Sequence, residues 1–346
     1  MSKVSLPNLS MPELITLLGE LGEPSFRAKQ VARWLHRRLA SSCDQMTDLP
    51  VPLRQRLAEV AQVRTIQPIS QVSSADGATR KELFGLADGQ TVETVLMLYP
   101  GRRTVCVSSQ AGCAVGCPFC ATGQGGYRRN LTAGEMVEQV LHFAAEAPVT
   151  NVVFMGMGEP LANYEATLKA VRILNAPDLF GLGARHVTIS TAGLVPRIRR
   201  LAAEPLQVGL AVSLHAPTNE LRDELVPLNK KYPLEELIAA CRDYFAATGR
   251  RITFEYALFD GINCFRRQAR ELADLLRELP CHVNLIPANL TADARFQPPP
   301  VGIRHAFQAE LTRLGVNCTL REGRGQDIAA GCGQLRGRYE AKRVAP

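Results

Sequence analysis

Three cysteines within eight residues are the part of this sequence best suited to chemistry. They are Cys113, Cys117 and Cys120, in the run Cys-Ala-Val-Gly-Cys-Pro-Phe-Cys. Three thiolates at this spacing, just after a predicted strand, can hold three of the four irons of a [4Fe–4S] cluster. The fourth iron then stays open to a small molecule. A zinc site is the alternative, but it needs a fourth ligand and usually pairs its cysteines as CxxC. We therefore predict a catalytic iron–sulfur cluster.

A glycine-rich segment with one acid follows the second predicted strand of the main domain. It reads Gly156-Met157-Gly158-Glu159-Pro160. Glycines let a backbone approach a ligand closely, and the carboxylate of Glu159 can accept hydrogen bonds from an ammonium group. Taken alone, the segment is more typical of a tight turn between a strand and a helix.

Of the ten cysteines, two others have distinctive positions. Cys332 lies between two glycines, which make its loop pliant, and Cys106 lies seven residues before Cys113. By themselves both are more typical of buried thiols without a role. Glu93, in the run Val-Glu-Thr-Val, is by itself expected to face solvent. We interpret the remaining cysteines as packing residues: Cys43, Cys241, Cys264, Cys281 and Cys318.

Alternating strands and helices position these residues from about Arg103 onward. The predicted strands are Val105–Ser108, Asn151–Phe154, His186–Ser190, Val208–Leu214, Ile252–Leu258 and Cys281–Ile286. The predicted helices include Ala133–Ala145, Tyr164–Leu174, Leu234–Thr248 and Phe265–Leu279. Repeated βα units predict a parallel sheet with helices outside it. Polar residues at the strand ends mark the edge where such barrels carry their chemistry: Ser109, Glu159, Ser190, Ser213, His215 and Asn289.

The first hundred residues have a different pattern. Residues 1–65 are predicted to be helical, with Ser25 capping a basic helix over Phe26–Ala40. That basic face is an RNA contact or simply a solvated surface. Between Thr79 and Tyr99, two β-type runs flank Asp88-Gly89, which predicts a β-hairpin or short meander.

Composition limits the classes of partner. The chain has 346 residues, a net charge of +7 and a pI near 9.0, which suits a polyanion such as nucleic acid. No run of 18 apolar residues predicts a membrane span, and the N-terminus does not resemble a signal peptide. We expect a cytoplasmic protein with reduced thiols.

The CxxxCxxC spacing is the signature of the radical S-adenosylmethionine (SAM) superfamily, and the βα pattern after it is similar to that superfamily's partial barrel. More of the chain resembles the RlmN family of dual-specificity adenine-C2 methyltransferases, which act on 23S rRNA and tRNA. The segments that carry this resemblance, in order, are Cys106-Val-Ser-Ser-Gln-Ala-Gly-Cys113, Arg129-Asn-Leu-Thr132, Phe154-Met-Gly-Met-Gly-Glu-Pro-Leu161, Ser190-Thr-Ala-Gly193, Ser213-Leu-His-Ala216 and Cys332-Gly-Gln-Leu335.

The resemblance implies an α/β fold with a partial (β/α)6 TIM-type barrel over residues 103–320. It also implies a helical, basic, RNA-binding accessory domain at 1–65, a β-hairpin linker at 66–102 and a C-terminal loop at 321–346. The implied cofactors are a [4Fe–4S] cluster on the three clustered cysteines and two molecules of SAM per turnover. The SAM pocket implied by the resemblance consists of Gly158, Glu159, Ser190, Ser213, Leu214, His215 and Asn289.

The resemblance also implies three catalytic roles. Cys332 becomes an S-methylcysteine, Cys106 resolves the RNA adduct through a transient disulfide, and Glu93 accepts a proton. The implied product is carbon-2-methylated adenine in the peptidyl-transferase centre of 23S rRNA and beside the anticodon of tRNA. We further expect a monomer that contacts no membrane and receives electrons from flavodoxin or ferredoxin. The expected phosphate contacts, besides the basic helix, are Arg102, Arg103, Arg128, Arg129, Arg321, Arg324, Arg336 and Arg338.

The chain departs from the family pattern at three places. Gln326 stands where we associate an aspartate with the family, Gly331 replaces an expected alanine, and Thr291–Pro300 lacks a Tyr-Lys-Arg-Pro-type run. These departures bear on the fit of RNA and on position selectivity. A Cfr-type enzyme that methylates carbon 8 of the same rRNA adenine is therefore an alternative. A non-enzymatic iron–sulfur RNA-binding protein is a more remote one, since it would need neither Cys106 nor Cys332.

Overall fold

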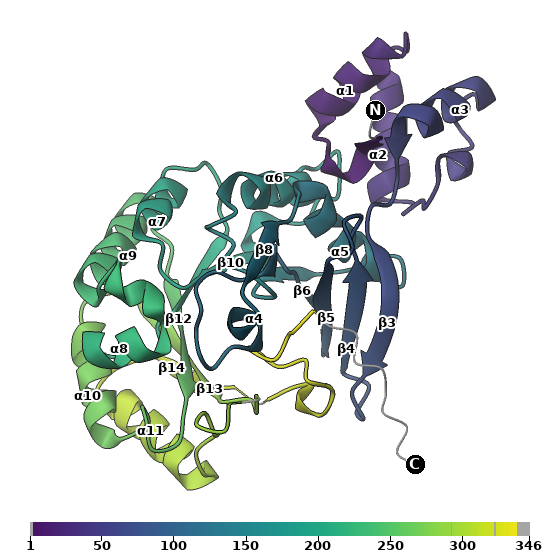
Figure 1. The fold of residues 1–346 in the computed structure, drawn as a ribbon. Helices are drawn as coiled ribbons and strands as arrows, with labels where there is room; N and C mark the ends of the chain where they lie inside the picture. Colours follow the sequence, from purple (N-terminus) through teal and green to yellow (C-terminus); the bar gives the residue numbers. More distant parts are fainter. Residues whose placement is uncertain (1–2, 292, 322, 338–346) are drawn as a thin grey trace, which may run out of the picture.

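One ten-stranded sheet organises the computed structural model, which describes residues 3–291, 293–321 and 323–337 (Figure 1). Its strand order is β14-β13-β12-β11-β10-β9-β6-β5-β4-β3. The strands from β6 to β14 are parallel neighbours, and the sheet does not close on itself. Their bounds are β6 (Arg102–Cys106), β9 (Asn151–Phe154), β10 (Val187–Thr191), β11 (Gly209–Ser213), β12 (Ile252–Leu258), β13 (Cys281–Pro287) and β14 (Cys318–Leu320). This is the predicted partial barrel.

Helices cover the outer side of the parallel strands (Figure 1). They are α5 (Ala133–Ala144), α6 (Tyr164–Asn175), α7 (Val195–Ala202), α8 (Asn219–Leu225), α9 (Leu234–Thr248), α10 (Arg266–Leu275) and α11 (Val301–Arg313). Strand side chains such as Val152, Ile189 and Phe254 are fully buried between the two layers. Burial of a large apolar side chain contributes about 2 kcal/mol, so this layer is the main source of stability.

Three antiparallel strands continue the sheet beyond β6. They are β3 (Gln67–Ser73), β4 (Thr79–Gly85) and β5 (Thr91–Tyr99). The β4–β5 pair is the hairpin predicted around Asp88-Gly89, and β3 makes it a meander. Since β5 also pairs with β6, where Val95 lies opposite Cys106, the meander extends the barrel sheet.

The N-terminal residues form a small helical unit against α5 (Figure 1). It contains β1 (Val4–Ser5), η1 (Leu6–Asn8), α1 (Met11–Glu20), α2 (Phe26–His36), η2 (Cys43–Gln45), α3 (Val51–Val60) and β2 (Ala61–Gln62). The buried carboxylate of Glu138 on α5 accepts hydrogen bonds from the backbone N–H groups of Thr65 (2.7 Å) and Ile66 (3.2 Å). These bonds fix the unit to the barrel.

The basic helix begins at Phe26 as predicted but ends at His36, four residues earlier than predicted. The predicted cap at Ser25 was wrong, because its side chain makes no capping hydrogen bond and its backbone is already helical (φ −56°, ψ −27°). Leu39 has a φ of +56°, which turns the chain away from the helix.

Short connecting elements complete the described chain. They are β7 (Gln110–Gly112), α4 (Ala121–Gln124), β8 (Tyr127–Asn130), η3 (Ala184–His186), η4 (Pro227–Lys230) and η5 (Gln326–Ile328). Among the described residues, no helix has both the length and the apolar character that a membrane span requires.

Candidate active site

The loop of three cysteines starts just beyond the carboxyl end of β6. It follows β7, which pairs antiparallel with β8. Two backbone hydrogen bonds shape the loop: the N–H of Cys113 donates to the Gly126 carbonyl, and the N–H of Cys120 donates to the Cys117 carbonyl, both at 3.1 Å. Gly112 has a φ of +76°, and a Cβ there would lie 1.9 Å from the Gly126 oxygen. Only glycine fits this approach.

The three thiols of this loop lie near enough to influence one another. Burial, reinforced by the thiols of Cys120 and Cys113, raises the pKa of Cys117 well above its usual value. Burial also raises the pKa of Cys113 to about 12. No group of three His, Cys, Asp or Glu side chains in the described ranges is placed to hold a single metal ion. A [4Fe–4S] cubane takes one thiolate on each of three irons, and the three thiols clustered on this loop are that set of donors.

The glycine-rich segment after β9 places a buried acid beside this loop. The Oε1 atom of Glu159 accepts from Leu161 N–H (2.9 Å), and Oε2 accepts from Ala192 N–H (2.7 Å). Burial raises the pKa of Glu159 to about 7, although these backbone donors oppose the effect. Gly158 has a φ of +97°, and a Cβ there would lie 2.5 Å from Gln110. The segment therefore needs glycine to bring its acid to the strand ends.

The other predicted pocket residues on β10 and β11 lie at the same edge of the barrel. Ser190 is in the last part of β10, and Ser213 ends β11. His215 follows with a φ of +61°, and its Nδ1 accepts a hydrogen bond from Ala257 N–H (3.0 Å). Burial lowers the pKa of His215 to about 3, so its imidazole is neutral. These predicted pocket residues therefore lie together at the edge of the barrel where the strands end, and their role in binding SAM stays a prediction.

The C-terminal loop crosses from β14 back to the cysteine loop and the meander (Figure 1). The carbonyl of Gly333 accepts from Ala121 N–H (2.7 Å), and that of Leu335 accepts from the Thr122 hydroxyl (2.6 Å). Cys332 is thus held beside the cysteine loop. It is solvent-exposed, yet the protein atoms crowded around its thiol raise the pKa of Cys332.

Asn289 contacts this loop directly. Its side-chain amide donates to the Cys332 carbonyl (3.0 Å) and accepts from Gln326 Nε2 (2.7 Å). A Cβ at Gly331 would lie 2.6 Å from the Asn289 amide nitrogen. Two of the departures from the family pattern, Gln326 and Gly331, therefore meet at one predicted pocket residue.

Glu93 and Cys106 lie on adjacent strands, on the face that the C-terminal loop covers. Cys106 pairs with Val95, and Glu93 is two residues along β5, so both side chains point to the same face. Oε2 of Glu93 accepts from the N–H groups of Arg336 (2.6 Å) and Gly337 (3.0 Å), and Oε1 lies 2.9 Å from Lys81 Nζ.

Burial separates these two residues from ordinary surface groups. Only 5% of Glu93 is exposed, so the expectation from its residue type alone, a solvent-facing acid, was wrong. The C-terminal loop, which is distant in sequence, covers it. Burial together with the neighbouring Cys332 raises the pKa of Cys106 to about 12.

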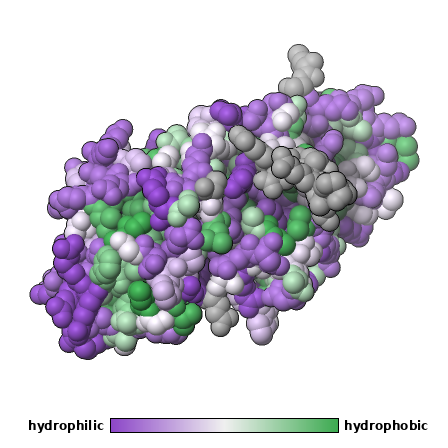
Figure 2. All heavy atoms as spheres, turned by 60° about the horizontal axis from the view of Figure 1, so that its bottom comes forward, coloured by the Kyte–Doolittle hydropathy of each residue, from purple (hydrophilic) through white to green (hydrophobic). Residues whose placement is uncertain are grey.

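Several arginines expected to contact phosphates have protein partners instead. Arg129 bonds to Asp88 and Glu135, and the Arg324 guanidinium donates to the Leu98 carbonyl. Arg102 and Arg128 are exposed, whereas Arg338 lies outside the described residues. Hydrophilic residues cover most of the face in Figure 2, with apolar residues in separate patches.

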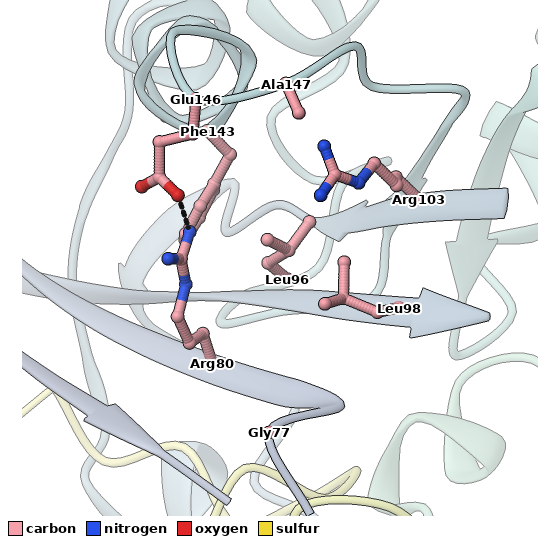
Figure 3. Close-up of a pocket in the computed structure, with 8 residues that line it drawn as sticks. All are labelled: Gly77, Arg80, Leu96, Leu98, Arg103, Phe143, Glu146 and Ala147. Carbon is pink, nitrogen blue, oxygen red and sulfur yellow. Dashed lines mark hydrogen bonds and ion pairs between the residues drawn. The ribbon is translucent and has the colours of Figure 1, made fainter.

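A small cavity of about 100 Å³ lies on the opposite face of the meander (Figure 3). Its lining residues are Gly77, Arg80, Leu96, Leu98, Arg103, Phe143, Glu146 and Ala147. Leu96 and Leu98 alternate with Glu93 and Val95 along β5, so the sheet separates this cavity from the cysteine site. We assign it no role in the chemistry.

Comparison with known proteins shows the family of this chain. Residues 107–284 match the radical SAM superfamily, and residues 4–63 match the ribosomal RNA large subunit methyltransferase N-terminal domain. A relative from Moorella thermoacetica, named "Probable dual-specificity RNA methyltransferase RlmN", is 51% identical over 97% of this chain and 98% of its own. The chain belongs to the RlmN family. A second RlmN relative, from Chloroflexus aurantiacus, is 49% identical over 98% of this chain and 94% of its own.

A solved structure extends the likeness to three dimensions. The crystal structure of a radical SAM methyltransferase from Sphaerobacter thermophilus has a TM-score of 0.94 and 53% identity, over 97% of this chain and 100% of that one. This RlmN-family protein is therefore a radical SAM RNA methyltransferase, and its superfamily implies a [4Fe–4S] cluster and SAM. The comparisons do not favour the Cfr-type alternative, and membership of an enzyme family removes the non-enzymatic one.

Proposed function

We propose that this enzyme methylates carbon 2 of an adenine in the peptidyl-transferase centre of 23S rRNA and of the adenine beside the anticodon in tRNA. The observation that supports the proposal is that the C-terminal loop brings Cys332 near Cys106 and donates backbone hydrogen bonds to Glu93, which shares a sheet face with Cys106. A methyltransferase that worked by direct displacement would need neither thiol.

The cofactors have matching residues in this site. Cys113, Cys117 and Cys120 would hold the cluster, and the pocket from Gly158 to Asn289 would hold SAM, with Glu159 facing its ammonium group. When bound, the cluster and SAM supply a methyl group and, after one-electron reduction, a 5′-deoxyadenosyl radical. In this proposal each turnover uses two SAM molecules, one for each of these tasks, and flavodoxin or ferredoxin provides the electron.

Cys332 carries the methyl group in the proposed reaction. Carbon 2 of adenine is electron-poor and a weak nucleophile, so a methyl group must reach it as a carbon radical. The exposed position of Cys332 lets its thiol face both SAM and an extruded base. Its two flanking glycines allow the loop to move between these partners; Gly333 has a φ of +81°.

Cys106 and Glu93 complete the proposed reaction. The radical adduct at carbon 2 gives up one electron, for which the oxidised cluster would be the acceptor. The Cys106 thiolate then attacks the Cys332 sulfur, the electron pair of the broken sulfur–carbon bond goes to the bridging carbon, which takes up a proton and becomes the methyl group, and a disulfide between Cys106 and Cys332 remains. Glu93 accepts the proton from carbon 2. Both of its carboxylate oxygens already have donors, so Glu93 must first release Lys81 or the backbone at Arg336 and Gly337. We propose that the enzyme acts as a monomer in the cytoplasm.

Nucleoside mass spectrometry tests the proposed product. The cluster-loaded enzyme would be incubated with SAM, a reductant and an rRNA fragment, with Cys332→Ala as the matched control. We expect 2-methyladenosine from the wild type and none from the variant. The appearance of 8-methyladenosine would retain the radical chemistry but refute the carbon-2 assignment.

A further inference from the structure

Arg222 on α8 is a buried cation that the reaction described above does not use. None of its surface is exposed to solvent, although arginine is among the residues least often buried without an ionic partner. Burial lowers the pKa of Arg222, but only to about 10, so the guanidinium remains charged at neutral pH. A charge in such a place must be compensated by its surroundings.

The hydrogen bonds of Arg222 hold the ends of two barrel strands. Nη2 donates to the carbonyls of Ala192 (2.6 Å) and Ser213 (3.2 Å), and Nε donates to that of Leu214 (3.1 Å). These carbonyls follow β10 and end β11, where the SAM pocket is expected. Gly193 has a φ of +113°, and a Cβ there would lie 3.3 Å from Nη2, so the loop fits closely around the guanidinium.

The hydrogen-bond acceptors around Arg222 are neutral. Besides the three carbonyls, Nη1 donates to the side-chain oxygen of Asn229 (3.0 Å). The acid in this network is Asp223, which accepts a hydrogen bond from Asn229 Nδ2 (2.7 Å) and acts on Arg222 as a neighbouring charge without pairing with it. Within the described part of the chain, no salt bridge of Arg222 is present. Buried charges are normally paired with an opposite charge, so we expect a further anion near the guanidinium of Arg222.

The cysteine loop lies close to Arg222. Cys117 and Phe119 pack against an apolar cluster that includes Leu225 and Val226, which follow Arg222 closely along the chain. The electrostatic effect of Arg222 reaches the Cys117 thiol, where it opposes the much larger effect of burial. The thiolates of the cysteine loop, once they carry a cluster, are therefore an anionic group close to this buried cation.

We propose that Arg222 is the built-in counter-charge of the iron–sulfur cluster and raises its reduction potential, while its hydrogen bonds position the ends of β10 and β11. A [4Fe–4S] cluster with three thiolate ligands has a net negative charge, and the uptake of one electron increases it. A fixed cation nearby stabilises the reduced form more than the oxidised form. The inference depends on cluster binding by the three cysteines and not on which adenine carbon is methylated.

A redox titration without RNA or SAM tests this role. Wild-type, Arg222→Met and Arg222→Lys proteins would be loaded with iron and sulfide, assayed for iron content, and titrated with dithionite while EPR measures the reduced cluster. At a fixed potential we expect Arg222→Met to lower the ratio of reduced to oxidised cluster by about tenfold, which is about 59 mV for one electron. Arg222→Lys keeps the charge and should stay near the wild-type potential.

The lysine variant also separates charge from positioning. It cannot reproduce the fork of bonds to Ala192, Ser213 and Leu214, so its KM for SAM should rise while its potential is retained. Arg199→Met removes an exposed arginine of α7 that pairs with Asp243 of α9; it is the matched control and should change neither the potential nor the KM. If Arg222→Met does not load a cluster, Arg222→Gln takes its place with the same expected fall in potential. A wild-type potential in a loaded, uncharged variant would overturn the proposal.

Discussion

At the scale of single residues, the thiols and the buried acid of this site have pKa values that favour their neutral forms when no cofactor is bound. The thiols of Cys106, Cys113 and Cys332 all have pKa values raised by burial, whereas reactive cysteines usually have lowered ones. Glu159 is similar, since burial outweighs its two backbone donors. Metal coordination deprotonates thiols, and an ammonium group favours a carboxylate. Cys113 and Glu159 are thus arranged for a charged ligand rather than for reactivity alone.

Glu159 gives the metal-free protein a specific pH dependence. Its pKa is about 7 in the folded protein against 4.5 in a free side chain. Below pH 4.5 both states keep the proton. Between pH 4.5 and 7 only the unfolded state loses it, so the stability present at low pH is lost, by about 3 kcal/mol. Denaturant unfolding of wild type and Glu159→Gln at pH 4.5 to 8 should show this loss only in the wild type; parallel curves for both proteins would contradict it.

At the scale of elements, the C-terminal loop adds Cys332 and its backbone N–H groups to the barrel edge where the predicted pocket residues lie. It joins η5, Cys332 and the backbone at Arg336 and Gly337 to strands far away in sequence. Asn289, two residues after β13, connects to this loop through hydrogen bonds with Cys332 and Gln326. The amide of Asn289 therefore faces the loop here, although the family resemblance assigns it to SAM. Asn289 therefore belongs both to the predicted SAM pocket and to the contacts that hold the C-terminal loop.

Gly331→Ala tests how tightly this contact holds the loop. The added Cβ would collide with the Asn289 amide and displace it from the Cys332 carbonyl. Losing a hydrogen bond of about 1 kcal/mol should speed the alkylation of Cys332 by iodoacetamide about fivefold. Peptide mass spectrometry would follow the reaction. Gly302→Ala in α11, where a Cβ meets nothing within 4 Å, should leave the rate unchanged. An equal rate in all three proteins would mean that Asn289 does not restrain the loop.

The strands and long helices could be predicted because their patterns are local. The spans Asn151–Phe154, Ile252–Leu258 and Leu234–Thr248 were predicted with the bounds observed. The helices predicted by name did not include α7, α8 or α11, and of these α7 and α8 have at most eight residues and are rich in charge. The buried state of Glu93 could not be predicted from its own strand, because residues more than 240 positions away cover it. The burial of Arg222 could not be predicted either, because nothing in the sequence distinguishes it from the many other arginines.

At the scale of the whole molecule, three parts converge on one reaction. The parallel strands present the cysteine loop and the proposed SAM pocket, the meander adds Glu93 on the same sheet face as Cys106, and the C-terminal loop brings Cys332 near Cys106. The helical unit at the N-terminus is fixed to α5 by Glu138 and carries the exposed basic residues Lys29 and Arg33. The central claim is that RNA passes through a covalent bond to Cys332 that only Cys106 can release.

Purification of Cys106→Ala protein from cells tests this claim most directly. Without the resolving thiol, the protein should carry covalently attached RNA, and tandem mass spectrometry after nuclease digestion should place the adduct on Cys332. Cys43→Ala, which removes a buried thiol of the N-terminal unit, and Cys106→Ala combined with Cys332→Ala should both be free of RNA. An RNA adduct at Cys332 in the single variant alone is the predicted result. Cys106→Ala protein with an intact cluster and no attached RNA would contradict the account.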